Sequence, residues 1–160
     1  MPALTAILHT HNDALRIARA VESLRPCDEV LVIDHASSDE TCRVAREFGA
    51  RVVAAAAGSS EADFLREARH DWIFFLLPTE SLSEGLEASL YEWKLREELP
   101  VAEQKVYAVG ILEETHSEWV THTPEARLAH RVHVRWDAGR LAASENSCVL
   151  DGHLLRLRIP

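Results

Sequence analysis

The stretch Val30-Leu-Val-Ile-Asp34-His-Ala-Ser-Ser-Asp39-Glu-Thr41 decides the fold that we expect. An apolar run that reaches an acid, a turn of small residues and then helix-capping residues is typical of a strand that leads into a helix. In open α/β sheets, ligands bind outside the carboxyl ends of the strands. The sequence therefore predicts that this strand delivers the Asp34 carboxylate to a ligand crevice.

Strand-like and helix-like segments alternate on both sides of this stretch through the first hundred residues. The expected strands are residues 4–9, 29–33, 51–54 and 72–76, and the expected helices are 12–24, 37–49, 61–69 and 83–98. Such alternation predicts an α/β fold with a mostly parallel sheet and helices on both of its faces. The unbroken apolar run from Trp72 to Leu76 fits a central strand of that sheet.

The character of the sequence changes after about residue 100. Four further strand-like segments follow, at residues 106–112, 118–122, 126–136 and 149–159. They are joined by turns, so we expect a mixed or antiparallel C-terminal part. No linker or repeat separates the two parts, which predicts a single domain over residues 1–160, with halves 1–100 and 101–160.

Composition excludes several classes of protein. With 160 residues, 47% hydrophobic and 27% charged, the chain fits a globular domain, and no apolar stretch reaches the length of a membrane span. The N-terminus lacks a basic start and a cleavage site, so we expect a cytoplasmic protein. A net charge of −9 without a basic cluster argues against nucleic-acid binding. Three cysteines without a CxxC spacing indicate neither a disulfide framework nor a zinc site.

Two strand-end motifs resemble those of the inverting, nucleotide-sugar-dependent family 2 glycosyltransferases. Their first strand commonly ends Thr-x-Asn, as in Thr10-His11-Asn12, and their second reads like Ile33-Asp34-His35-Ala36-Ser37-Ser38-Asp39-Glu40-Thr41. The resemblance implies a glycosyltransferase-A-like (Rossmann-like) fold, in which residues 1–100 form the nucleotide-binding half. It also implies that Asp34 engages the donor base, with Thr10 and Asn12 in the same pocket. The alternatives are that Asp34 caps its own turn and that Asn12 caps the first helix.

The end of the fourth expected strand departs from that family. The family usually reads Leu-Asp-Ala-Asp-Glu there, and its carboxylates hold a divalent cation beside the donor diphosphate; this chain reads Leu76-Leu77-Pro78-Thr79-Glu80. Hard cations prefer charged oxygen ligands, and only Glu80 offers one. The Asp-x-Asp motif is therefore degenerate, a Mn²⁺ or Mg²⁺ cofactor is doubtful, and Glu80 is at most a weak metal ligand.

Other candidate residues come from the resemblance or from composition alone. Arg66 matches the position of a family arginine that faces the donor, although pairing with Asp63 is the alternative. The catalytic base stays unassigned, with Glu113, Glu114 and Glu118 as candidates. His9, His11 and His35 lie at two strand ends and could form a transition-metal site, or they could form hydrogen bonds within the fold.

Together these features predict a glycosyltransferase-like protein that binds a nucleotide or a nucleotide-sugar. If active, it would transfer a hexosyl group, but we expect weak or absent activity because the metal-binding acids are replaced. The alternative is a non-catalytic interaction scaffold that holds a protein partner, or a second copy of itself, through Trp119, Trp136 and its strand edges.

Overall fold

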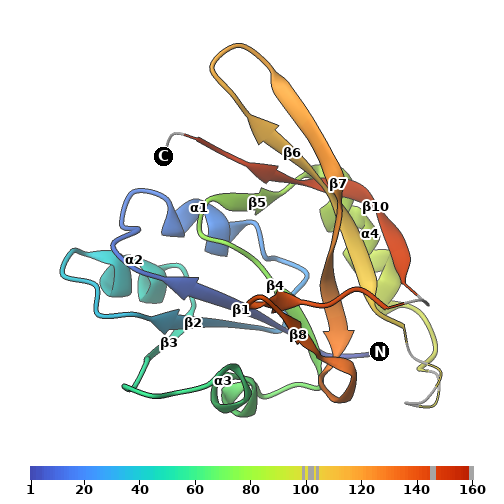
Figure 1. Ribbon diagram of the computed structural model, residues 1–160, viewed down its shortest axis with the longest axis horizontal. Helices are drawn as coiled ribbons and strands as arrows, with labels where there is room; N and C mark the ends of the chain where they lie inside the picture. The colour runs from blue at the N-terminus through green and yellow to red at the C-terminus, as the bar shows by residue number, and fades with distance from the viewer. Residues whose placement is uncertain (99, 101–102, 104, 145–146, 159–160) are drawn as a thin grey trace.

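The computed structural model describes residues 1–98, 100, 103, 105–144 and 147–158. Its centre is an eight-stranded sheet with the strand order β3-β2-β1-β4-β7-β6-β10-β5, and a second, two-stranded sheet pairs β8 with β9 (Figure 1). Among the described residues, no helix has the length and apolarity needed to cross a membrane.

The N-terminal half forms the parallel part of the sheet, as the alternating pattern predicted. The strands are β1 (Leu4–Thr10), β2 (Glu29–Asp34), β3 (Arg51–Ala54) and β4 (Trp72–Phe75). Strand β1 lies between β2 and β4, and its last residue, Thr10, is in register with Asp34. The carboxyl ends of β1 and β2 therefore lie side by side, where the sequence placed the ligand crevice.

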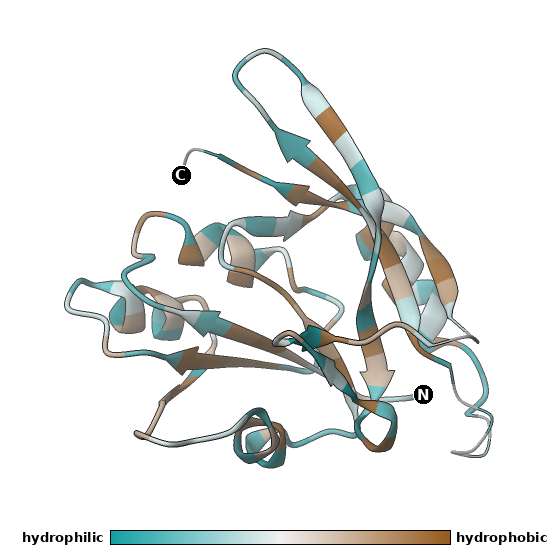
Figure 2. Cartoon of the chain, in the orientation of Figure 1, coloured by the Kyte–Doolittle hydropathy of each residue, from teal (hydrophilic) through white to brown (hydrophobic). Residues whose placement is uncertain are grey.

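Helices cover both faces of this sheet, as expected. They are α1 (Ile17–Glu22), α2 (Thr41–Glu47), α3 (Glu61–Glu67) and α4 (Glu84–Lys94). Side chains alternate along each strand, so Leu8 and Phe74 join the core on the side of α1, α2 and α4, whereas Ile7 and Ile73 pack against Phe64 of α3. The apolar stretches of these strands are visible in Figure 2.

The first helix begins later than predicted. The expected start at Asn12 is wrong because residues 11–16 form a loop, and α1 begins at Ile17. The Asp13 carbonyl accepts hydrogen bonds from the backbone N–H groups of Arg16 and Ile17, which closes the turn that leads into the helix. Helix α2 begins at Thr41 rather than near Ser37, and α4 ends at Lys94 rather than Glu98.

The C-terminal half is mixed, as predicted, but its strands have other limits. Strands β6 (Tyr107–Glu114) and β7 (Trp119–His130) form a long antiparallel hairpin, so the two segments expected at 118–122 and 126–136 are one strand that ends earlier. The remainder of the second segment is a 3₁₀ turn followed by the β8 (Trp136–Asp137) and β9 (Arg140–Leu141) hairpin.

The last strand, β10 (Cys148–Arg156), lies between β6 and β5 in the sheet. It runs parallel to β6 and antiparallel to β5 (Glu80–Leu82), a short strand that the sequence did not predict. The predicted end of this strand at Ile159 lies outside the described residues. Gly152, with φ +90°, forms a bulge against α4, and a Cβ there would lie 2.3 Å from the Leu86 nitrogen. Only glycine fits this approach.

Candidate functional site

The loops that follow β1 and β2 are tied together by side-chain hydrogen bonds. The Asn12 amide carbonyl accepts from the Ser38 N–H at 2.8 Å, and the Asn12 N–H donates to the Ser37 hydroxyl at 2.9 Å. Asn12 adopts the left-handed conformation, with φ 52°, that asparagine tolerates better than most residues. Asn12 therefore joins the two loops, and its alternative role as cap of the first helix is wrong because that helix starts at Ile17.

Thr10 and Asp34 both bond to their own loops. The Thr10 hydroxyl donates to the Asp13 carboxylate at 2.7 Å, and one Asp34 oxygen accepts from the Ser37 N–H at 3.2 Å. Burial disfavours the charged form of Asp34, but hydrogen bonds from Ser37 and Cys42 outweigh it and lower the pKa of this carboxyl. Asp34 thus caps its own turn, which is the alternative role given for it in the sequence analysis. Recognition of the donor's nucleotide base by Asp34 stays a prediction.

Three histidines and one glutamate meet at the ends of the same two strands. Within hydrogen-bond distance, His9 Nδ1 lies 2.8 Å from His35 Nε2, and the ring of His11 bonds to the His35 carbonyl. His9 Nε2 lies 3.4 Å from a carboxylate oxygen of Glu61. Burial lowers the pKa of His9, against the opposing effect of Glu61. Among the described residues, no three His, Cys, Asp or Glu side chains are grouped as a metal site requires. The hydrogen bonds of His9, His11 and His35 match the alternative, in which these histidines bond within the fold.

Two cavities adjoin this histidine group and share Glu61. The first, the loop cavity, has a volume of about 660 Å³. Its walls are the loops after β2 and β3 and the start of α3, namely His35, Ala36, Ala55, Ala56, Ala57, Ser59, Ser60, Glu61 and Phe64.

The loop cavity is distinct from a depression of about 470 Å³ at the tip of the β6–β7 hairpin. The loop cavity is open, lies at the carboxyl ends of two parallel strands, and has the apolar ring of Phe64 in its wall. Asp34 is not among its lining residues, whereas the next two residues, His35 and Ala36, are.

The second cavity, the arginine cavity, has a volume of about 290 Å³ and has His9 in its wall. Most of its wall is apolar, and Trp136 packs edge-on against Phe75 with ring centroids 5.2 Å apart. The lining residues are Ile7, His9, Glu61, Phe75, Leu76, Leu77, Pro124, Glu125, Ala126, Arg127, Trp136, Gly139, Arg140, Leu141 and Ala143. This cavity therefore brings the ends of β1 and β4 together with β7 and the β8–β9 hairpin.

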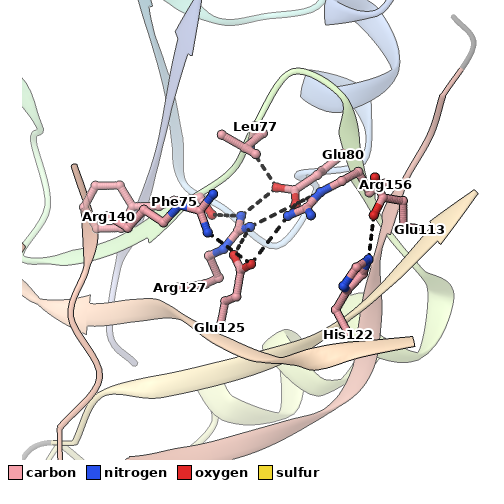
Figure 3. Close-up of polar contacts among 9 residues, drawn as sticks. All are labelled: Phe75, Leu77, Glu80, Glu113, His122, Glu125, Arg127, Arg140 and Arg156. Carbon is pink, nitrogen blue, oxygen red and sulfur yellow. Dashed lines mark hydrogen bonds and ion pairs between the residues drawn. The ribbon is translucent and has the colours of Figure 1, made fainter. Parts of the chain in front are cut away.

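Glu80 points toward Arg127 and Arg156 (Figure 3). Its side chain is 0% exposed and accepts two hydrogen bonds from the Arg127 guanidinium, at 2.6 and 2.9 Å. Arg156 donates to it at 3.0 Å, and the Leu77 N–H donates at 2.9 Å. A carboxylate with this many donors is a structural ion-pair partner, so the geometry disfavours Glu80 as a metal ligand.

Glu125 extends this ion-pair group toward the arginine cavity. Its carboxylate lies 2.9 Å from Arg127, 3.7 Å from Arg156 and 3.6 Å from Arg140. Burial opposes its ionisation, but the arginines outweigh burial and lower the pKa of Glu125; burial likewise opposes the charge of Arg127, but Glu80 and Glu125 raise its pKa. We call Glu80, Glu125, Arg127, Arg140 and Arg156 the ion-pair cluster.

The remaining candidates lie apart from both cavities. Arg66 is exposed and pairs with Asp63 one turn earlier on α3, which is the alternative that the sequence offered. On the β6–β7 hairpin, Glu113 contacts His122, while Glu114 and Glu118 line the depression at the hairpin tip. The sequence missed Arg140 and Arg156 altogether, because nothing in their local pattern distinguishes them from surface arginines.

Comparison with known proteins gives partial matches. No protein-family model matches the chain. Two crystal structures of glucosyl-3-phosphoglycerate synthase from Mycobacterium tuberculosis are similar, one with Mg²⁺ and UDP, and one with Mn²⁺, UDP and phosphoglyceric acid. Each is 22% identical, with a TM-score of 0.44, and the match covers 50% of this chain and 34% of that one.

Curated relatives are found among uncharacterized glycosyltransferases of Rickettsia. The protein from Rickettsia felis is 36% identical over 93 residues, which are 54% of this chain and 32% of the relative. The protein from Rickettsia bellii is 34% identical over 90 residues, which are 52% of this chain and 30% of the relative. The matches thus span about a third of these relatives' length. The similarity supports the prediction of a glycosyltransferase.

Proposed function

We propose that this chain is a family 2 glycosyltransferase-like domain that binds a nucleotide or nucleotide-sugar and has weak or no transferase activity. The observation that carries the proposal is the pair of adjoining cavities at the carboxyl ends of β1, β2, β3 and β4, which share Glu61. This is the edge of an α/β sheet where ligands bind. A cytoplasmic location and a single domain over residues 1–160 remain parts of the proposal.

In this arrangement the loop cavity takes the nucleoside. The Phe64 ring and the alanines 55–57 offer apolar surface, and His35 adds a polar edge. The arginine cavity takes the diphosphate and the sugar, against Trp136 and beside its polar groups. The diphosphate would then pass close to the histidine group. Thr10, Asn12 and Asp34 would contribute by fixing the loops after β1 and β2 with their hydrogen bonds.

The expectation of weak activity rests on the end of β4. Leu77 provides no oxygen ligand in its side chain, the Thr79 carbonyl accepts a hydrogen bond from Leu157, and Glu80 belongs to the ion-pair cluster. Losing several kcal/mol of charge stabilisation on the leaving group would slow transfer by orders of magnitude.

Binding can be tested by titration calorimetry with UDP-glucose and GDP-mannose, with and without Mn²⁺. We expect one of them to bind, and Ala56→Trp, which fills the exposed side of the loop cavity, to abolish that binding. Ala88→Trp, at an exposed position of α4, is the matched control and should bind the nucleotide-sugar normally. Equal binding by both variants would place the nucleoside elsewhere, and rapid metal-dependent sugar transfer would contradict the expectation of weak activity.

A second candidate function is that of an interaction scaffold, and the β6–β7 hairpin favours it. Trp119 on this hairpin is 48% exposed and Val120 lies next to it, whereas Trp136 is used in the wall of the arginine cavity. Exposed aromatic residues of this kind are enriched at protein interfaces. Light scattering after size exclusion tests this function: an oligomer that Trp119→Ser dissociates would support it, and a monomer unaffected by nucleotide would argue against self-association.

A further inference from the structure

The end of β4 does not fit the divalent cation that the resemblance implies. The surviving acid, Glu80, is buried and bonded to Arg127 and Arg156. A cation that recruited this carboxylate would leave the buried Arg127 guanidinium and the part-buried Arg156 guanidinium without their main partner, which is costly. The disagreement concerns the chemistry of the residues present, because Leu77 and Thr79 bring no carboxylate to replace Glu80.

The ion-pair cluster instead carries a surplus of positive charge. It contains three arginines and two glutamates, so its formal charge is +1. Arg127 donates hydrogen bonds to Glu80, Glu125 and the Phe75 carbonyl, and Arg156 donates to Glu80. Arg140 is different: its side chain is 74% exposed, and it lies 3.6 Å from Glu125, beyond good hydrogen-bond distance.

Arg140 also has the right position to meet a ligand. It lies in the β8–β9 hairpin and lines the arginine cavity together with Leu77 and Trp136. Once a ligand fills the cavity, its apolar walls exclude water and strengthen a charge-assisted hydrogen bond from Arg140 to a bound anion. Of the two acids in the wall of this cavity, Glu61 pairs with His9 and Glu125 is held by Arg127.

We infer that Arg140 supplies the positive charge for a diphosphate in the arginine cavity, so that this chain binds nucleoside diphosphates without a divalent cation. The inference rests on the proposed function and deepens it. A guanidinium can donate two parallel hydrogen bonds to phosphate oxygens, which a point charge such as lysine cannot reproduce. Glu125 lies 3.6 Å from Arg140 and is held by Arg127, which in turn is held by Glu80.

The test measures the dissociation constants of UDP, GDP and inorganic pyrophosphate for the full chain by calorimetry, in EDTA and in Mn²⁺. We expect the tighter nucleotide to bind equally well, within about threefold, in both buffers. Arg140→Gln should weaken it roughly ten- to hundredfold, the range of a lost charge-assisted hydrogen bond. The affinity of Arg140→Lys should lie between those of the unmodified chain and Arg140→Gln. Pyrophosphate should bind the three proteins in the same order of affinity.

Arg43→Gln is the matched control, because Arg43 is an exposed arginine paired with glutamates on α2, and it should bind normally. Thermal unfolding checks that Arg140→Gln folds. Binding that requires Mn²⁺, or equal affinity in Arg140→Gln and the unmodified chain, would overturn the inference and leave the proposed function standing. Failure of every nucleotide in both buffers would overturn the proposed function and the inference with it.

Discussion

Replacing Glu80 by glutamine should strongly destabilise the fold, because it removes the charge that compensates a buried arginine. The Arg127 side chain is only 7% exposed; glutamine can accept only one of its two hydrogen bonds to Glu80 and places an amide NH₂ group where the other oxygen was. Breaking a buried ion pair in this way costs about 3–5 kcal/mol. Glu125 still contacts Arg127, so we expect about 3 kcal/mol, or a fall in Tm of roughly 6–12 °C for a domain of this size.

Urea unfolding followed by tryptophan fluorescence measures the change in free energy, and thermal unfolding measures the change in Tm. Glu40→Gln is the control, since Glu40 pairs with Arg43 on the exposed surface of α2, and its Tm should stay unchanged. The double variant Glu80→Met with Arg127→Met removes both charges and should recover much of the loss. The reasoning is refuted if Glu80→Gln costs less than about 1 kcal/mol, or if the double variant loses the sum of the two single changes.

Two further changes test other parts of the structure. Glu29 is buried; burial opposes its ionisation, but hydrogen bonds from Arg69, Thr5 and Arg51 outweigh burial and lower its pKa. The folded pKa lies below the unfolded value of about 4.3, so this carboxylate stabilises the fold above that pH and the contribution is lost as the pH falls. Glu29→Gln should therefore be less stable at pH 7 and less sensitive to pH between about 5 and 3 in acid titrations of urea midpoints; an unchanged profile would contradict this. Gly152→Ala should cost roughly 2–4 kcal/mol, because of its positive φ and its contact with Leu86, and a Tm like that of the unmodified chain would show that α4 can move aside.

The sequence predicted the parallel half of the fold because its signals are local. Apolar runs such as Trp72–Phe75 and the caps at Ser60 and Ser83 act over a few residues, and the structure places strands and helices there. The start of α1 was missed because the loop bonds of Asn12 and Asp13 to residues 37–41 compete with helix formation.

The candidate site was less predictable because its contacts are long-range. Glu80 meets Arg127 and Arg156 across 47 and 76 residues of sequence, and β5 exists because it pairs with β10. The rule that ligands bind at strand ends correctly predicted that His9, His35 and Asp34 lie at one edge of the sheet. It could not predict that the Glu80 side chain bonds to two arginines. Side-chain direction at a strand end depends on partners that only the folded chain supplies.

A crystal structure of the chain with its preferred nucleoside diphosphate, grown with Mn²⁺ present, tests the central claim most directly. The account predicts the base in the loop cavity, a phosphate oxygen within about 3 Å of the Arg140 guanidinium, and Glu80 still bonded to Arg127. A Mn²⁺ ion bound by Glu80 beside the diphosphate, with Arg127 displaced, would contradict it.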